Sequence, residues 1–250
     1  GQPPPLTTVR LRAVNQRGAD SPSANHEKFL STSIAECRVS RTHVLVMIPG
    51  RGELARGFVG NHVTNPQNRP EIYSYVPRFF PVSNSSVVAD ELPGQREFFT
   101  NHNWTFQAKH SLFLAVLDGD GKEVVRQTFD LRDPTAAAKE VGEFLAAHRP
   151  KPRDAIADFE AALAEAKRTD RRVWVTVGHT RGKQCFGLLM WFESHAQLLS
   201  KDYVVFEFDD LRDMNGPELN NRLNFAGHGT PFHAILDSNG KELIRSTDPK

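Results

Sequence analysis

The chain contains the same pattern twice, and this duplication restricts its fold more than any other feature. Six residues of an early segment recur 130 positions later without a gap. They are Phe29, Val44, Val46, Arg51, Gly52 and Gly57, with counterparts Phe159, Trp174, Thr176, Arg181, Gly182 and Gly187. A second match, of residues 117–123 with 236–242, has a spacing of 119, so the first copy carries 11 more residues in its middle. The two matches indicate two homologous domains of one fold.

Composition sets broad limits on function. With 250 residues, 39% of them hydrophobic, the chain can bury two modest cores. Lys and Arg number 31 against 30 Asp and Glu, so no net field attracts nucleic acid or an anionic membrane. The longest apolar runs, 186–192 and 112–117, are far shorter than the roughly 20 residues of a membrane-spanning helix. We therefore expect a soluble chain without a nucleic-acid partner or a membrane span.

The start of the chain bears on its location. It opens on Gly1-Gln2-Pro3-Pro4-Pro5 and contains no signal peptide. Such a start is typical of a processed terminus, which favours a periplasmic or secreted location over a cytoplasmic one. The two cysteines, Cys37 and Cys185, are too few for a disulfide-stapled scaffold.

Composition shifts mark the domain limits. Residues 1–22 are an N-terminal extension, 23–148 the first domain, 149–153 a linker rich in Pro and basic residues, and 154–250 the second domain. Within the first domain, residues 136–148 are predicted to form a closing helix. No such helix follows Arg245 in the second domain, so we expect the first domain or a partner to cover one face of its sheet.

The second copy has alternating helix and strand patterns. Helical periodicity predicts helices at 155–166, 185–199 and 217–223. β-branched and aromatic runs predict strands at 173–177, 203–208, 232–236 and 242–244, the last two joined by a turn at 237–240. This order predicts an α/β fold in which each domain has a mixed central sheet flanked by helices.

The first copy carries its extra residues in the segment 61–107, which is rich in Pro and aromatic residues. The aromatic residues are Tyr73, Tyr75, Phe79, Phe80, Phe98, Phe99, Trp104 and Phe106. Long ordered insertions in compact domains are often functional, which favours a face that binds a peptide or the other domain. The alternative is that these side chains pack the first core.

The second copy resembles the thioredoxin family. The family's apolar strand, short loop and Cys-x-x-Cys at a helix start match residues 173–177 and then Gly182-Lys183-Gln184-Cys185. The family's cis-proline before a core strand matches Thr230-Pro231. The resemblance implies two tandem thioredoxin-like domains, with Cys185, Gly182, Lys183, Gln184, Thr230 and Pro231 as the candidate site residues.

Departures from the family pattern limit the chemistry. Gly182 stands where the family has its nucleophilic cysteine, and Thr176 where thioredoxin has a buried carboxylate, so dithiol exchange within this domain is excluded. In the first copy, Gly52 and Ala55 occupy the two cysteine positions and Leu112 that of the proline. The resemblance therefore implies a structural or binding role for the first domain.

Two interpretations of Cys185 stay open. In the first turn of a helix near Lys183, its thiol would be activated for single-cysteine chemistry. The matching cysteine of the family is the more buried one, and a buried thiol is usually inert. Cys37 corresponds to Lys167 at the spacing of 130 and is expected to be a small buried packing residue.

Histidines raise the question of a metal site. His179 lies in the active loop and His228 just before the proline, so with Cys185 they are candidate copper or zinc ligands. His195 and His233 are weaker candidates. Surface or hydrogen-bonded histidines explain this spacing better, and we expect neither a metal nor another cofactor.

Two functions follow from these expectations. The first is a thioredoxin-like protein with a degenerate single-cysteine loop and a thiol-dependent redox or thiol-binding role. The alternative is a non-catalytic module that uses the proline loop to hold a protein or extended-peptide partner by β-type contacts. The accessibility of Cys185 separates the two functions.

Overall fold

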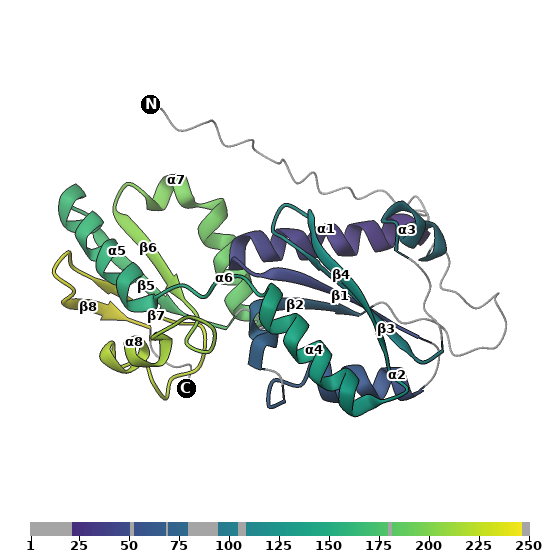
Figure 1. Ribbon diagram of the computed structural model, residues 1–250. Coiled ribbons are helices and arrows are strands. Elements are labelled where there is room, and N and C mark those ends of the chain that lie inside the picture. The colour runs from purple at the N-terminus through teal and green to yellow at the C-terminus, as the bar shows by residue number, and fades with distance from the viewer. Residues whose placement is uncertain are drawn as a thin grey trace.

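The chain folds around two separate four-stranded sheets (Figure 1). The computed structural model describes residues 22–50, 53–68, 70–79, 95–104, 109–179 and 182–246. The strand orders are β2-β1-β3-β4 and β6-β5-β7-β8. In each sheet the two central strands are antiparallel, and one parallel and one antiparallel neighbour flank them. The two mixed sheets confirm two tandem α/β domains of one topology.

The first domain contains the following elements: α1 (Pro22–Ser40), β1 (His43–Pro49), α2 (Glu53–Phe58), η1 (Val59–Val63), η2 (Pro70–Ser74), β2 (Tyr75–Phe79), α3 (Gln95–Asn101), β3 (Ser111–Leu117), β4 (Glu123–Asp130) and α4 (Pro134–His148). Helices α1 and α3 cover one face of the sheet, and α2 and α4 cover the other (Figure 1). Both faces of β1 are therefore buried, which explains its uninterrupted apolar sequence.

The second domain contains α5 (Ala155–Thr169), β5 (Arg172–Val177), α6 (Lys183–Ser194), α7 (Ala196–Leu199), β6 (Tyr203–Phe208), α8 (Gly216–Arg222), β7 (Phe232–Leu236) and β8 (Glu242–Arg245). Its core lies between the sheet and helices α5 and α8. On the opposite face, Trp191 and Phe192 of α6 contact Trp174, while Ile244 of β8 is 61% exposed.

The helix predicted at 185–199 is wrong in one respect, because the chain forms two helices that part at His195. There the backbone leaves helical geometry, with φ −109° and ψ 12°. The His195 ring stacks on Trp191, and its Nδ1 lies 2.9 Å from the Trp191 carbonyl oxygen. A side chain that bonds its own helix backbone competes with the next turn, which accounts for the break.

The spacing of 130 is also wrong for the first helix and strand, where the structure gives 129. Helices α1 and α5 are followed by residues in the left-handed conformation, Arg41 and Asp170. The turns after them are closed by equivalent bonds, Thr42 N–H to Cys37 O and Arg171 N–H to Ala166 O. The spacing of 130 holds for the starts of α2 and α6, and 119 holds for the hairpins.

This one-residue shift changes which residues correspond. Leu30, 2% exposed, takes the place of Phe159, whereas the expected counterpart Phe29 is 46% exposed. Cys37 corresponds to Ala166, and both are fully buried, so its match to Lys167 is wrong and its packing role is confirmed. Successive strand residues point to opposite faces, so a slip of one residue exchanges the buried and exposed sets.

Several other expectations have clear outcomes. The aromatic residues Tyr75, Phe98, Phe99 and Trp104 are buried in the first domain and pack its core. Phe80 and Phe106 lie outside the described residues.

The linker expected at 149–153 falls between α4 and α5, and the domain limits stay a prediction. In the described part of the chain, no helix combines the length and apolar character needed to cross a membrane.

Candidate functional site

The candidate site forms where β5 and β7 end at the same edge of the second sheet. Val177 pairs with Phe232, so the loop after β5 and the residues before β7 are neighbours. The Thr230-Pro231 peptide bond is cis. A small hollow of about 20 Å³, partly open to solvent, lies between this loop and α6. Its lining includes Thr176, His179, Cys185, Leu188, Leu189 and Pro231.

Cys185 lies in the first turn of α6 with its sulfur enclosed. The residue is 4% exposed, and its Sγ accepts a hydrogen bond from the His179 amide at 3.4 Å. A Cβ atom added at Gly178 or Gly182 would lie 3.2 Å or 3.0 Å from this sulfur. The backbone of the loop therefore covers the thiol at close range, and a side chain at either position would crowd the sulfur.

The position of the missing carboxylate has a structural role instead. Thr176 is buried, and its Oγ1 donates a hydrogen bond to the carbonyl oxygen of Phe232 at 3.1 Å. This bond satisfies the hydroxyl and ties β5 to β7. Thr176 thus offers no proton to the thiol side of the site.

The start of α6 has no capping side chain at its N-cap position. Gly182 is the N-cap residue, in an extended conformation and without a side-chain cap. Gln184 points to solvent. Thr180, Arg181 and the side chain of Lys183 lie outside the described residues, so the expected help of Lys183 to the thiol stays a prediction.

The proline loop leaves backbone groups available. Within the described part of the chain, the amide and carbonyl of Thr230 make no hydrogen bond. Gly227 and Gly229 beside it have open space around the position of a Cβ atom. Pro231 packs at the hollow and leaves Thr230 half-exposed at its rim.

The acidic pair beside His179 was not predicted from the sequence. Asp209 and Asp210 directly follow β6, the parallel neighbour of β5. His179 Nδ1 lies 3.2 Å from Asp210 Oδ1 and 3.9 Å from Asp209 Oδ1. The signal was available, because residues that follow adjacent parallel strands meet at one edge of the sheet.

These carboxylates keep His179 charged. Hydrogen bonding and charge attraction, from Asp209 first and then Asp210, raise the pKa of His179 to about 10. Nδ1 and Asp210 Oδ1 lie within ion-pair distance but are not aligned as a hydrogen bond. The ring is an imidazolium at neutral pH, next to the loop that covers Cys185.

The same three residues have the composition of a cation site. Ligand atoms of His179, Asp209 and Asp210 all lie within 4.8 Å of one another. Asp209 Oδ1 already accepts the amides of Leu211 and Arg212. A metal ion needs the neutral imidazole, so the arrangement fits a protonated histidine better than a metal.

The metal ligands considered from the sequence are not brought together. His228 stacks on Phe232 with ring centroids 4.1 Å apart, and Cys185 and His228 lie outside the group formed by His179 and the two aspartates. His195 and His233 contact Trp191 and Trp174 instead.

The equivalent place in the first domain is filled. Ala55 is 1% exposed and Leu112 is fully buried, both within the core cluster that packs against α4. Gly52 lies outside the described residues. Apolar packing thus takes the place of a loop with free backbone groups.

One comparison with known proteins, that with a family model, agrees with this geometry. A family model described as Thioredoxin-like matches residues 154–238, from the start of α5 to the turn after β7. A search of curated proteins found no match. Among solved structures, the bb fragment of ERp72 is similar at 14% identity, over 92% of this chain and 91% of that chain, with a TM-score of 0.30. The two sheets and the family match together support a thioredoxin-like fold, and the matched second domain is thioredoxin-like.

Proposed function

We propose that this chain is a non-catalytic thioredoxin-fold binding protein, whose second domain holds an extended segment of another protein at the Thr230-Pro231 loop. The observation that supports this choice is the enclosure of Cys185 at 4% exposure beneath Gly178 and Gly182. A thiolate must reach its target to attack, and here no second cysteine stands at position 182 to do so first. The thiol-dependent role is therefore the weaker of the two functions.

Binding of an extended segment matches the groups that remain available. The unpaired amide and carbonyl of Thr230 can each form one hydrogen bond to the backbone of a partner strand, as in β-type recognition. The adjoining hollow is small, but its lining residues Leu188, Leu189 and Pro231 give the segment an apolar surface beside the loop.

The first domain is not proposed as a second site of this kind. Ala55 and Leu112 fill the equivalent place with buried side chains. We propose that the first domain has a structural role and that recognition belongs to the second.

A fluorescent, reduced and carboxymethylated α-lactalbumin tests the proposal, because it stays unfolded and has no free thiol. We expect saturable binding, measured by anisotropy, that Gly229→Trp weakens about tenfold or more, equivalent to about 1.4 kcal/mol. Gly229 has open space around it, so the new side chain obstructs the loop without a clash inside the domain.

Gly60→Trp is the matched control, because Gly60 also has open space but lies in the first domain. It should bind like the wild type, as should Cys185→Ser. No binding by the wild type, or equal loss in both tryptophan variants, would contradict the proposed function.

A further inference from the structure

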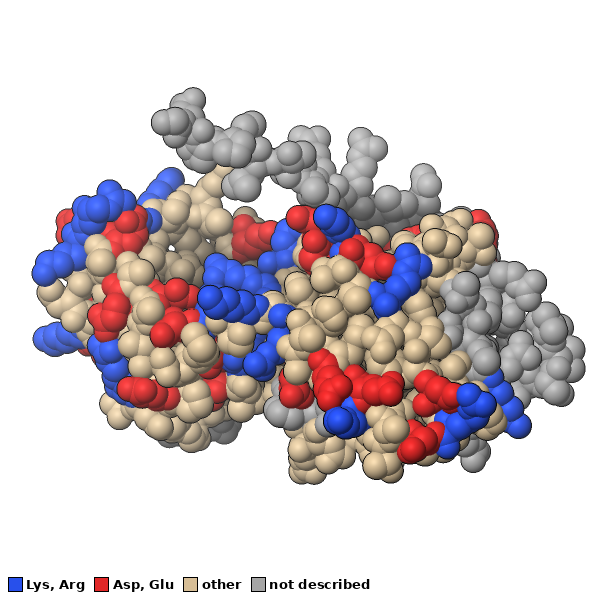
Figure 2. Space-filling model, in the orientation of Figure 1, with Lys and Arg blue, Asp and Glu red and all other residues tan. Residues whose placement is uncertain are grey.

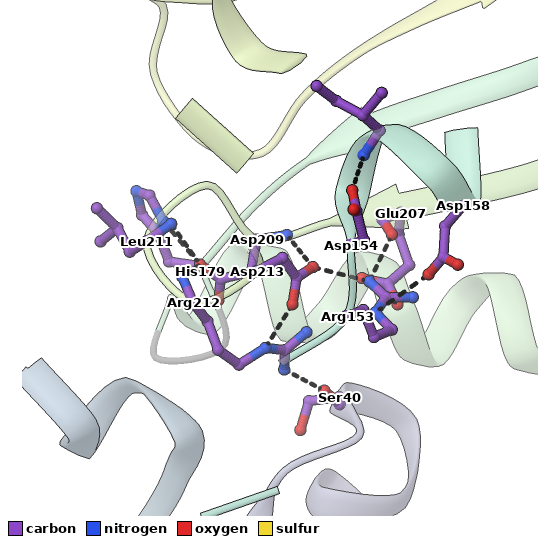
Figure 3. Close-up of polar contacts among 11 residues, drawn as sticks. Ser40, Arg153, Asp154, Asp158, His179, Glu207, Asp209, Leu211, Arg212 and Asp213 are labelled. Atoms are coloured by element: carbon purple, nitrogen blue, oxygen red, sulfur yellow. Dashed lines mark hydrogen bonds and ion pairs between the residues drawn. The ribbon is translucent and has the colours of Figure 1, made fainter. Parts of the chain in front are cut away.

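One side chain of the second domain reaches the first. Arg212 follows β6, is 5% exposed in its side chain, and donates from Nη1 to the carbonyl oxygen of Ser40 at 2.6 Å (Figure 3). Ser40 is the last residue of α1. On the face shown in Figure 2, basic side chains gather where the two domains meet.

This contact completes the end of a helix. The last carbonyls of an α-helix have no partner within the helix, and its C-terminus carries partial negative charge. Ser40 is 2% exposed, so water has little access to it. The guanidinium of Arg212 supplies both the donor and the positive charge, so a residue of one domain caps a helix of the other.

The same guanidinium also holds Asp213. Arg212 Nε donates to Asp213 Oδ1 at 2.9 Å. The other oxygen, Oδ2, accepts from the Asp209 amide at 3.0 Å and from Arg153 Nη2 at 2.9 Å. The Asp213 side chain has no exposed surface, so its position depends on these donors.

Asp213 in turn fixes the segment that faces the candidate site. Its bond to the Asp209 amide closes the turn 209–213, and Asp209 and Asp210 present their carboxylates to His179. The His179 amide contacts Cys185, and its ring lines the hollow. Contacts therefore run from Ser40 through Arg212 and the turn 209–213 to the site (Figure 3).

We propose that Arg212 couples the two domains and is a positioning residue for the candidate site. By capping α1 and holding Asp213, it keeps the turn 209–213, and with it His179, in the arrangement that binds the partner. The first domain thus acts as a support on which the binding domain depends. The effect on binding rests on the proposed function, whereas the effect on His179 does not.

The first test follows the titration of the His179 ring by NMR in the full chain. Arg212→Met removes every donor and keeps an unbranched side chain, so we expect the titration midpoint of His179 to fall by about one pH unit or more. The titratable and charged groups around this ring are Asp209 and Asp210, with Cys185 and Glu207 in the same hollow and Arg153 beside Glu207. The variant changes none of these groups but removes the positive charge of Arg212, which alone would raise the midpoint, so a fall reports the lost positioning.

The control is Arg168→Met, which breaks only an exposed pair with Glu165 and should leave the His179 midpoint unchanged. Arg212→Lys retains a donor and the charge, and should recover part of the effect. If Arg212→Met does not fold, a lysine variant whose midpoint lies between those of wild type and histidine in water supports the inference. An Arg212→Met midpoint equal to that of the wild type contradicts the inference, and if that variant does not fold, an Arg212→Lys midpoint equal to that of the wild type contradicts it.

The second test measures binding of the carboxymethylated α-lactalbumin probe. Arg212→Met should weaken it about fivefold or more, the lower end of ordinary coupling between sites. An unchanged His179 midpoint in Arg212→Met would by itself overturn the inference, and unchanged binding would overturn its effect on the partner. If the wild type fails to bind the probe, the proposed function fails, while the NMR titration still decides whether Arg212 positions His179.

Discussion

At the scale of the residue, the identity of a side chain says less about its chemistry than its surroundings do. Cys185 occupies the position where this fold places a functional sulfur, yet two glycines and the His179 amide enclose it. The sequence predicted the position but left reactivity open, because burial depends on a loop whose packing no local pattern encodes.

Cys185 should therefore react slowly in the folded protein. With iodoacetamide at pH 7, we expect alkylation of Cys185 to be about a hundredfold slower than in urea-unfolded chain, since attack requires the thiolate to be exposed. Cys37, fully buried, is the internal comparison and should be equally slow. Both cysteines are free, so peptide mapping can follow each one. Rapid alkylation of Cys185 alone would restore the thiol-dependent function.

His179 gives the second prediction at this scale. Its pKa in the folded chain is raised to about 10, above the value of about 6.5 in the unfolded chain. The stabilisation is thus fully present below about pH 6.5 and is lost as the pH rises through about 10. The ring is partly exposed, so we expect a discounted effect of about 1–2 kcal/mol.

Urea unfolding of wild type and His179→Gln checks this sign. The wild type should be more stable at pH 6, and the difference between the two proteins should shrink by pH 10. A difference that grows with pH would show that folding favours the neutral ring. Because the comparison is between two proteins at each pH, titration of tyrosines and lysines cancels.

At the scale of the element, turns that require a fixed backbone geometry were predicted correctly. Elements recognised by residue type alone were matched one residue out of register. Gly121 and Gly240 have φ of 79° and 82°, as the turn chemistry required, and both hairpins lie at the spacing of 119. The match of the first helix and strand was wrong by one residue, because no residue type there requires a particular register. Leu30 and Phe159 occupy equivalent buried positions, whereas Phe29 is exposed and is an accidental match.

Alanine at these two glycines is a matched pair of tests. Each substitution puts a side chain in the left-handed region, which costs about 1–2 kcal/mol. At Gly240 the new Cβ meets Leu163 at an ordinary 3.5 Å, but at Gly121 it lies 2.8 Å from Ile34 Cδ1. Gly121→Ala should therefore destabilise its domain more than Gly240→Ala destabilises the other. Thermal unfolding of both variants measures this, and an equal or reversed order would contradict the contact argument.

At the scale of the whole molecule, the duplication predicted two domains of one topology but not how they meet. The contact of Arg212 with Ser40 joins residues 172 positions apart. The two domains also differ in their cores. The first buries apolar clusters on both faces of its sheet, whereas the main cluster of the second lies on one face and Ile244 of β8 is 61% exposed.

This difference predicts unfolding in two steps, with the second domain unfolding at the lower urea concentration. Apolar burial stabilises by about 25 cal/mol per Å², so the sheet covered on both faces has the larger driving force. Trp104 is buried in the first domain, and Trp174 and Trp191 lie in the second, so fluorescence can separate them. Trp104→Phe should report the lower midpoint, and the Trp174→Phe, Trp191→Phe double variant the higher one.

Trp104→Phe also removes the 3.1 Å hydrogen bond from Nε1 to Glu123, so this variant weakens the first domain itself. The predicted order of unfolding must therefore hold although the domain expected to unfold last has been destabilised. Circular dichroism of the wild type, which sees both sheets, should show both steps. A single midpoint shared by all three proteins would mean that the contact through Arg212 makes the domains one cooperative unit. A first domain that unfolds at the lower concentration would contradict the argument from core burial.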